Sequence, residues 1–179
     1  MSITDKLFSF QGRLRRRDWW LFSILIAIIG AVLNGVGTSL VGGTVTPAMI
    51  MNGSADLAGA MTKSIEVQTV VSLLLLWPGL AVGYKRLHDR NKTGTILAGL
   101  AVLSFVYRGV VFFTMGSRVG AVGPAAVMPG PLALALGCLV LIVAIWMLIE
   151  LGFLDGTQGP NKYGPSPKGL GAEEVGFST

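Results

Sequence analysis

The sequence predicts an all-α protein that crosses a membrane with four helices, and three observations support this. Hydrophobic residues make up 52% of the 179 positions, and the mean hydropathy is +0.68, well above that of a typical soluble domain. Only 13% of the residues are charged, and they cluster between long apolar runs. Each run is long enough to cross about 30 Å of hydrocarbon. The net charge of +5 is then explained by basic membrane loops, so we expect no nucleic-acid partner.

Residues 1–18 form a basic segment before the first apolar run. Ile3, Leu7, Phe10 and Leu14 are spaced four, three and four residues apart, which places them on one face of a helix. This spacing predicts an amphipathic helix in the plane of the membrane surface, and the alternative is a frayed tail. Four arginines follow, each attracting anionic lipid by about 1 kcal/mol. They are Arg13, Arg15, Arg16 and Arg17.

Residues 19–151 contain the four predicted spans, at about 19–41, 67–84, 95–115 and 131–151. The first begins with Trp19 and Trp20, whose rings favour the headgroup level. Its apolar run is too long for a cleaved signal peptide, so we expect it to be retained. Ser54 is a candidate cap for a short helix in the connection before the second span. Pro78 is expected to kink that span.

Residues 152–179 form a tail rich in glycine and proline, which predicts a non-helical segment. The distribution of basic residues predicts the orientation. Eleven of the 14 basic residues fall on one side: Lys6, Arg13, Arg15, Arg16, Arg17, Lys85, Arg86, Arg90, Lys92, Lys162 and Lys168. Lys63 and Arg118 fall on the other. The positive-inside rule therefore places both termini in the cytoplasm.

The stretch from Tyr84 to Gly94 holds five charges and the single histidine. His88 and Asp89 are the only candidate acid–base pair, but adjacent helical residues point apart, so we expect no catalytic site. One histidine and one cysteine do not make a metal site, and we expect no cofactor. The first interpretation of this stretch is a solvated turn that anchors two helices. The alternative is a site for a phosphate or phospholipid headgroup, because paired arginines suit an oxyanion. The candidate lipid- or partner-binding residues are Arg13, Arg15, Arg16, Arg17, Arg86, His88, Asp89 and Arg90.

A second set of polar residues is expected to join that stretch. Glu150 ends the fourth span at about the depth of residues 85–89, where cations compensate it. Turns at the glycines of the tail would bring it back beneath the helices. We therefore predict one polar plate, with the alternative of a disordered tail: Arg13, Arg86, His88, Asp89, Glu150, Asn161 and Tyr163. Within it, a carboxylate is expected to hold His88, and Asp89 to pair with Arg86.

Arg108 is the one charge inside the third span. Its long side chain can reach toward the outer boundary, where Glu66 opens the second span. We predict that the two residues pair. The alternative is that Arg108 lines a polar cavity.

Three segments carry a resemblance to a known family. Residues 10–20, FQGRLRRRDWW, look like a Phe-x-Gly-Arg opening followed by tryptophan. Residues 85–94 contain Arg-Leu-His-Asp and then Thr-Gly, and residues 156–165 read GTQGPNKYGP. Together these resemble the bacterial domain of unknown function 805, whose members carry Ser and Trp where Thr93 and Thr95 stand here. The resemblance implies an inner-membrane protein with four helices and adds no activity.

Two classes of function remain open at this point. The first is a non-enzymatic membrane protein whose basic cytoplasmic face binds anionic lipid or a partner protein. The second is a small transporter or channel built as a homo-oligomer, since Gly30, Gly35 and Gly37 permit close helix contacts. A proton-coupled carrier usually needs a carboxylate in mid-membrane, whereas Glu66 and Glu150 lie near the boundaries. A membrane enzyme is the third choice.

Overall fold

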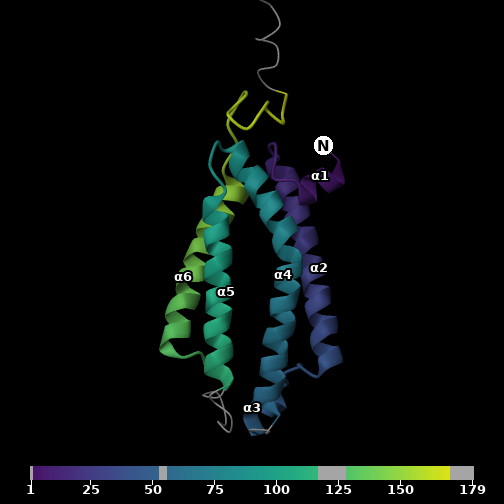
Figure 1. The fold of residues 1–179 in the computed structure, drawn as a ribbon, viewed down its shortest axis with the longest axis vertical. Helices are drawn as coiled ribbons and strands as arrows, with labels where there is room; N and C mark the ends of the chain where they lie inside the picture. Colours follow the sequence, from purple (N-terminus) through teal and green to yellow (C-terminus); the bar gives the residue numbers. More distant parts are fainter. Residues whose placement is uncertain (1, 53–55, 117–127, 170–179) are drawn as a thin grey trace, which may run out of the picture. The chain divides into compact units, whose positions relative to one another are not determined.

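The computed structural model describes residues 2–52, 56–116 and 128–169, and this part of the chain is helical with no strand (Figure 1). The elements are α1 (Ile3–Phe8), α2 (Arg16–Val41), α3 (Pro47–Asn52), α4 (Leu57–Asp89), α5 (Thr95–Gly116), α6 (Pro131–Leu148) and the π-helical turn η2 (Ile149–Phe153). Four helices are long and apolar enough to cross a membrane: α2, α4, α5, and α6 with its π turn. The predicted all-α fold with four membrane helices is confirmed.

Helix α4 begins at Leu57, ten residues before the predicted span, and runs unbroken for 33 residues with Pro78 inside it. Its first turns are packed, because Leu57 and Ala60 are each only 4% exposed. Burial of these residues stabilises a helix that the nearby glycines disfavour. The predicted cap at Ser54 lies outside the described residues.

Helix α1 is shorter than the apolar spacing predicted. Ser2 and Asp5 form a capping box at its start, and hydrogen bonds from the Ser2 side chain and backbone lower the pKa of the Asp5 carboxyl. The helix ends at Phe8, and Gly12 then adopts a φ of +88°. Leu14 is therefore off the helix, where it is 1% exposed and its N–H donates to the Lys85 carbonyl at 3.1 Å. The prediction of one amphipathic face from Ile3 to Leu14 was wrong, because a glycine turn ends it.

The chain divides into two compact units, and the first contains Met1–Ile28, Leu75–Leu100 and Val143–Thr179. Its core joins the N-terminal segment to the ends of α4 and α6. The buried core residues are Leu14, Trp19, Val82, Leu87, Met147 and Leu151. Large apolar side chains on the other face of α2 are exposed, among them Leu21 and Ile28. Such a face suits contact with lipid, since an aqueous surface rarely carries a continuous apolar patch.

The second unit contains Ile29–Leu74 and Ala101–Ile142. Small residues bring its helices together: a Cβ on Gly37 would lie 2.7 Å from Val67, which shows that α2 and α4 touch. A Cβ on Gly137 would lie 3.2 Å from Tyr107, which joins α6 to α5 in the same way. Glycines of this kind allow close helix packing in membranes.

Candidate functional site

Asp89, at the end of α4, lies at the centre of the most buried polar group in the first unit. Its carboxylate accepts hydrogen bonds from Arg13 Nε at 3.0 Å and from Arg86 Nη1 at 2.5 Å. The three side chains are 5%, 2% and 1% exposed, in the order Asp89, Arg13, Arg86. Charges removed from water in this way need close partners, and one carboxylate here serves two guanidinium groups.

Backbone carbonyls of the π turn and of the tail complete the bonding of both arginines. Arg13 donates to the carbonyls of Thr157 and Gly159, each at 2.7 Å. Arg86 donates to Leu151 at 2.8 Å and also to Leu154. A guanidinium group carries five N–H donors, which lets each arginine hold the carboxylate and the returning chain together. The tail is thus bonded to the end of α4.

The tail also caps α4 directly. The Thr157 N–H donates to the Asp89 carbonyl at 2.8 Å, and Asn161 Nδ2 donates to the His88 carbonyl at 2.9 Å. These are two of the last carbonyls of the helix, which lack partners within it. Gly156 permits the approach, because a Cβ there would overlap the Asp89 carboxylate. The turn continues through Gly159, whose φ is +74°.

His88 is held by a ring and a carbonyl group, whereas a carboxylate was expected. Its Nδ1 lies 3.3 Å from the Gly12 carbonyl oxygen. Its ring stacks on Tyr163, with centroids 3.8 Å apart and an interplanar angle of 10°. No group of three or more potential metal ligands comes together in the described residues. This geometry makes His88 a packing residue that links residues 9–15, α4 and the tail.

Glu150 lies in the π turn with its side chain 6% exposed. Its carboxylate accepts from Arg90 Nε at 2.7 Å and pairs with Lys92 Nζ. Arg86, which belongs to the stretch expected to compensate Glu150, bonds instead to Asp89 and the Leu154 carbonyl. The polar plate therefore contains two ion-pair centres, one at Asp89 and one at Glu150.

Lys85 also belongs to this buried group, although its role was not predicted. It is 0% exposed, and its Nζ donates to the carbonyls of Asp5 and Lys6 at 2.6 Å each. These carbonyls belong to α1, so Lys85 attaches that helix to α4. The sequence signal was weak, because a lysine near the end of a helix is also expected on an exposed surface.

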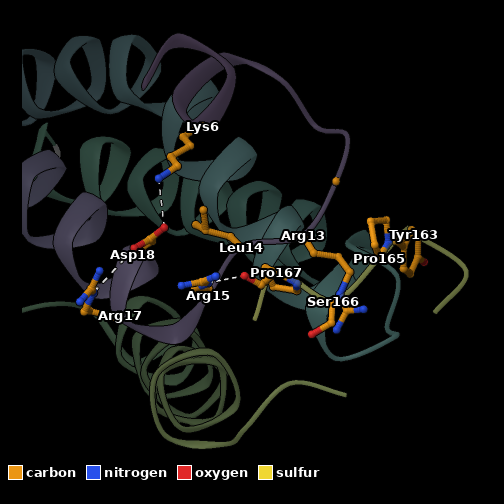
Figure 2. Close-up of a pocket in the computed structure, with 11 residues that line it drawn as sticks. Lys6, Arg13, Leu14, Arg15, Arg17, Asp18, Tyr163, Pro165, Ser166 and Pro167 are labelled. Carbon is orange, nitrogen blue, oxygen red and sulfur yellow. Dashed lines mark hydrogen bonds and ion pairs between the residues drawn. The ribbon is translucent and has the colours of Figure 1, made fainter. Parts of the chain in front are cut away.

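A cavity of about 610 Å³ lies between residues 6–18 and the tail (Figure 2). Lys6, Arg15, Arg17 and Asp18 line one side, and residues 165–167 line the other. Arg15 Nε donates to the Pro167 carbonyl, and Lys6 Nζ lies 3.0 Å from Asp18. The Arg17 side chain is 83% exposed and its Nε is 4.0 Å from Asp18. This cavity has a surplus of positive charge at its wall.

The arginines predicted to bind a lipid or a partner differ in how far they are buried. Arg13 and Arg86 are enclosed, whereas Arg15, Arg16 and Arg17 are exposed. Arg16 does not line the cavity; it pairs with Asp155 at 3.4 Å, across side chains 48% and 69% exposed. The enclosed pair fixes the fold of this face, and the exposed ones remain accessible to a ligand.

Arg108 and Glu66 lie in the second unit, on α5 and α4. Both line one cavity of about 370 Å³. The charged groups of these two residues lie more than 4.0 Å apart. The structure therefore places them around a common space and leaves their predicted contact unformed.

Comparison with known proteins places the chain among membrane proteins of unknown role. A family model described as "Protein of unknown function (DUF805)" matches residues 7–165. The "Uncharacterized protein YiiR" of Escherichia coli K12 is 33% identical over 165 residues, which cover 92% of this chain and 89% of the relative. The "Inner membrane protein YhaI" of the same strain is 26% identical over 168 residues, covering 94% and 93%. No solved structure matches the chain.

Proposed function

The chain belongs to the DUF805 family of proteins of unknown function, and we propose that it is a non-enzymatic membrane component whose basic cytoplasmic face binds the anionic headgroups of phospholipids. The observation that carries the proposal is the cavity of about 610 Å³ with Lys6, Arg15 and Arg17 at its wall. The proposed location is the bacterial inner membrane. The name of the relative YhaI and the four apolar helices support that location.

The proposed orientation, with both termini in the cytoplasm, rests on the basic residues. The cluster at residues 13–17 and the stretch 85–92 lie at the same end of the first unit, since Arg13 touches Asp89. Basic residues collect on the cytoplasmic side of membrane proteins, where the leaflet is also negative. The same charges would therefore orient the chain and attract its ligand.

The cavity lies at the level where a headgroup is expected. Trp19 and Trp20 follow the arginines directly, and Trp20 Nε1 donates to the Gly152 carbonyl at 3.0 Å. Tryptophan rings favour the membrane–water boundary. Ile3 and Phe8 on α1 are 69% and 57% exposed, which suits shallow insertion beside the cavity.

The chemistry of the exposed arginines favours a phosphate. A guanidinium group presents paired donors that match two phosphate oxygens. Arg15 and Arg17 are accessible, whereas Arg13 already bonds to Asp89 and the tail. Lys6 is paired with Asp18, which offsets its positive charge. Arg15 and Arg17 are therefore the proposed headgroup ligands.

The test compares two double variants that remove the same charge from the same face. Arg15→Gln with Arg17→Gln changes the cavity, and Arg16→Gln with Lys168→Gln changes exposed cations outside it. Native mass spectrometry of the purified protein would measure bound phosphatidylglycerol against phosphatidylcholine. At about 1 kcal/mol per cation, the first variant should lose roughly thirty-fold in preference for the anionic lipid.

The control variant should lose clearly less, because Arg16 is already paired with Asp155 and neither Arg16 nor Lys168 lines the cavity. Equal losses in both variants would mean that only diffuse charge attracts the lipid, and would overturn the cavity as the site. A protein captured through Arg15 and Arg17, without lipid preference, would favour the partner-binding alternative. Ion flux through proteoliposomes would favour a small oligomeric channel.

A further inference from the structure

Arg108 is a cation deep within a membrane-crossing helix. It lies thirteen residues after Thr95 and eight before Gly116, the ends of α5. At about 1.5 Å per residue, its backbone is roughly 20 Å from one end and 12 Å from the other. A charged group at such a depth is costly and usually marks a binding site or a transport path.

The side chain faces open space on two sides. It borders the cavity of about 370 Å³ and a second one of about 280 Å³, which Gln68 and Tyr107 also line. No ion pair within 4.0 Å joins Arg108 to an acidic side chain among the described residues. Glu66, the carboxylate on the same cavity, is exposed. The guanidinium group is therefore available to an anion from outside the chain.

Apart from Arg108, Glu66 and Thr69, the larger cavity is lined by apolar residues. Its walls are formed by α4 and α5, and the apolar lining residues are Ile65, Val70, Phe105 and Phe112. A cation at one point of an apolar wall suits a ligand with an acidic head and a hydrocarbon body. The volume falls in the range of about 300–1,000 Å³ that holds small ligands.

We propose that this cavity binds a long-chain fatty acid, with its carboxylate on Arg108 and its acyl chain along the apolar wall. The depth of Arg108 favours a fatty acid over a phospholipid, whose larger headgroup stays at the membrane boundary. A single carboxylate can accept two parallel hydrogen bonds from a guanidinium group. Gly109 leaves room for the chain, since a Cβ there would meet nothing within 4 Å.

The charge of Glu66 predicts the direction in which a substitution should change ligand binding. Its carboxylate lines the same cavity and would repel an anionic ligand. Removing that charge should strengthen the binding of a fatty acid, whereas removing Arg108 should weaken it. A cationic ligand would respond in the opposite direction to both changes.

The experiment uses the full chain in nanodiscs of phosphatidylcholine, with a photoreactive long-chain fatty acid and its uncharged methyl ester as probes. Peptide mapping should place the label of the acid on α4 and α5, at least ten-fold above that of the ester. Arg108→Gln should lower labelling by about ten-fold or more, and Glu66→Gln should raise it several-fold. Equal labelling by acid and ester, or a fall with Glu66→Gln, would overturn the proposal.

Two glycines of α5 allow a test variant and a control variant that leave the charge of the cavity unchanged. Gly109→Leu places a side chain in the cavity and should abolish labelling. Gly99→Leu adds the same side chain on the same helix, where a Cβ also meets nothing within 4 Å, but outside the cavity. It should leave labelling unchanged. Equal effects of the two variants, or competition by phosphatidylglycerol as strong as that by unlabelled fatty acid, would refute this site.

Discussion

Replacing Asp89 by asparagine tests whether buried ion pairs hold the tail against α4. Asparagine keeps the size of the side chain and removes its charge. Arg13 and Arg86, which are 2% and 1% exposed, would then share no carboxylate. We expect a large loss of stability and release of residues 154–167 from the helix end.

The size of the loss follows from burial. Removing one partner of a buried ion pair costs about 3–5 kcal/mol, because the remaining charge is uncompensated. Arg86 keeps the Leu151 carbonyl, which lies in the π turn and is not released with the tail, so we expect the lower end, about 3 kcal/mol. For a chain of this length that corresponds to roughly 6–12 °C in the melting temperature. Asp155→Asn breaks an exposed pair with Arg16 and should cost about 0–1 kcal/mol, or less than about 4 °C.

The assay is thermal unfolding in detergent, followed by tryptophan fluorescence, together with limited proteolysis of the tail. Asp89→Asn should melt well below Asp155→Asn and should expose the tail to cleavage. A double-mutant cycle between Arg13→Gln and Asp89→Asn should show coupling above about 1 kcal/mol. Equal melting temperatures for the two asparagine variants, or coupling below about 0.5 kcal/mol, would refute the reasoning.

Three further predictions concern the glycine contact at Asp89, the ring stacked on His88 and the membrane topology. Gly156→Ala should destabilise the tail contact, because the added Cβ overlaps the Asp89 carboxylate. Gly59→Ala should be neutral or stabilising, since its added Cβ would meet nothing within 4 Å. Melting temperatures would compare the two variants. Tyr163→Leu should lose about 0.5–1.5 kcal/mol of stacking on His88, and Tyr163→Phe should retain it, measured by the same melts. A reporter active only outside the cytoplasm should be silent after Thr179 and active near Asn52, and activity at Thr179 would reverse the proposed topology.

The four membrane helices were predictable because each depends on one property, the length of an uncharged apolar run. Their ends were less predictable. Helix α4 begins at Leu57, which is buried, and burial in the folded chain leaves no local pattern in the sequence. The extent of α1 was overestimated because the apolar spacing continues past Gly12, although the backbone turns there with a positive φ.

The polar residues of the site were predictable as a group, and their individual partners were not. A carbonyl acceptor leaves no mark in the sequence, so the Gly12 oxygen beside His88 was not anticipated. Glu150 pairs with Arg90 and Lys92 because the chain turns at Asn91, whose φ is +58°. That turn brings cations after the helix end toward Glu150 and leaves Arg86 free to bond to Asp89.

The buried network also controls the wall of the proposed headgroup cavity. Residues 165–167 form one side of that cavity, and the tail that carries them is bonded to Arg13. Asp89→Asn should therefore weaken phosphatidylglycerol binding even though Asp89 does not line the cavity. Native mass spectrometry should show a loss comparable to that of the Arg15 and Arg17 double variant.

Asp155→Asn is the matched control for this effect, because it removes one carboxylate from the same face and leaves the Arg13–Asp89 contact in place. Its lipid preference should stay within about three-fold of the wild-type value. If Asp89→Asn releases the tail to protease and the anionic lipid still binds unchanged, then residues 165–167 are not needed. Headgroup binding would then rest on the arginines of residues 13–17 alone, and the tail would serve only to stabilise the end of α4.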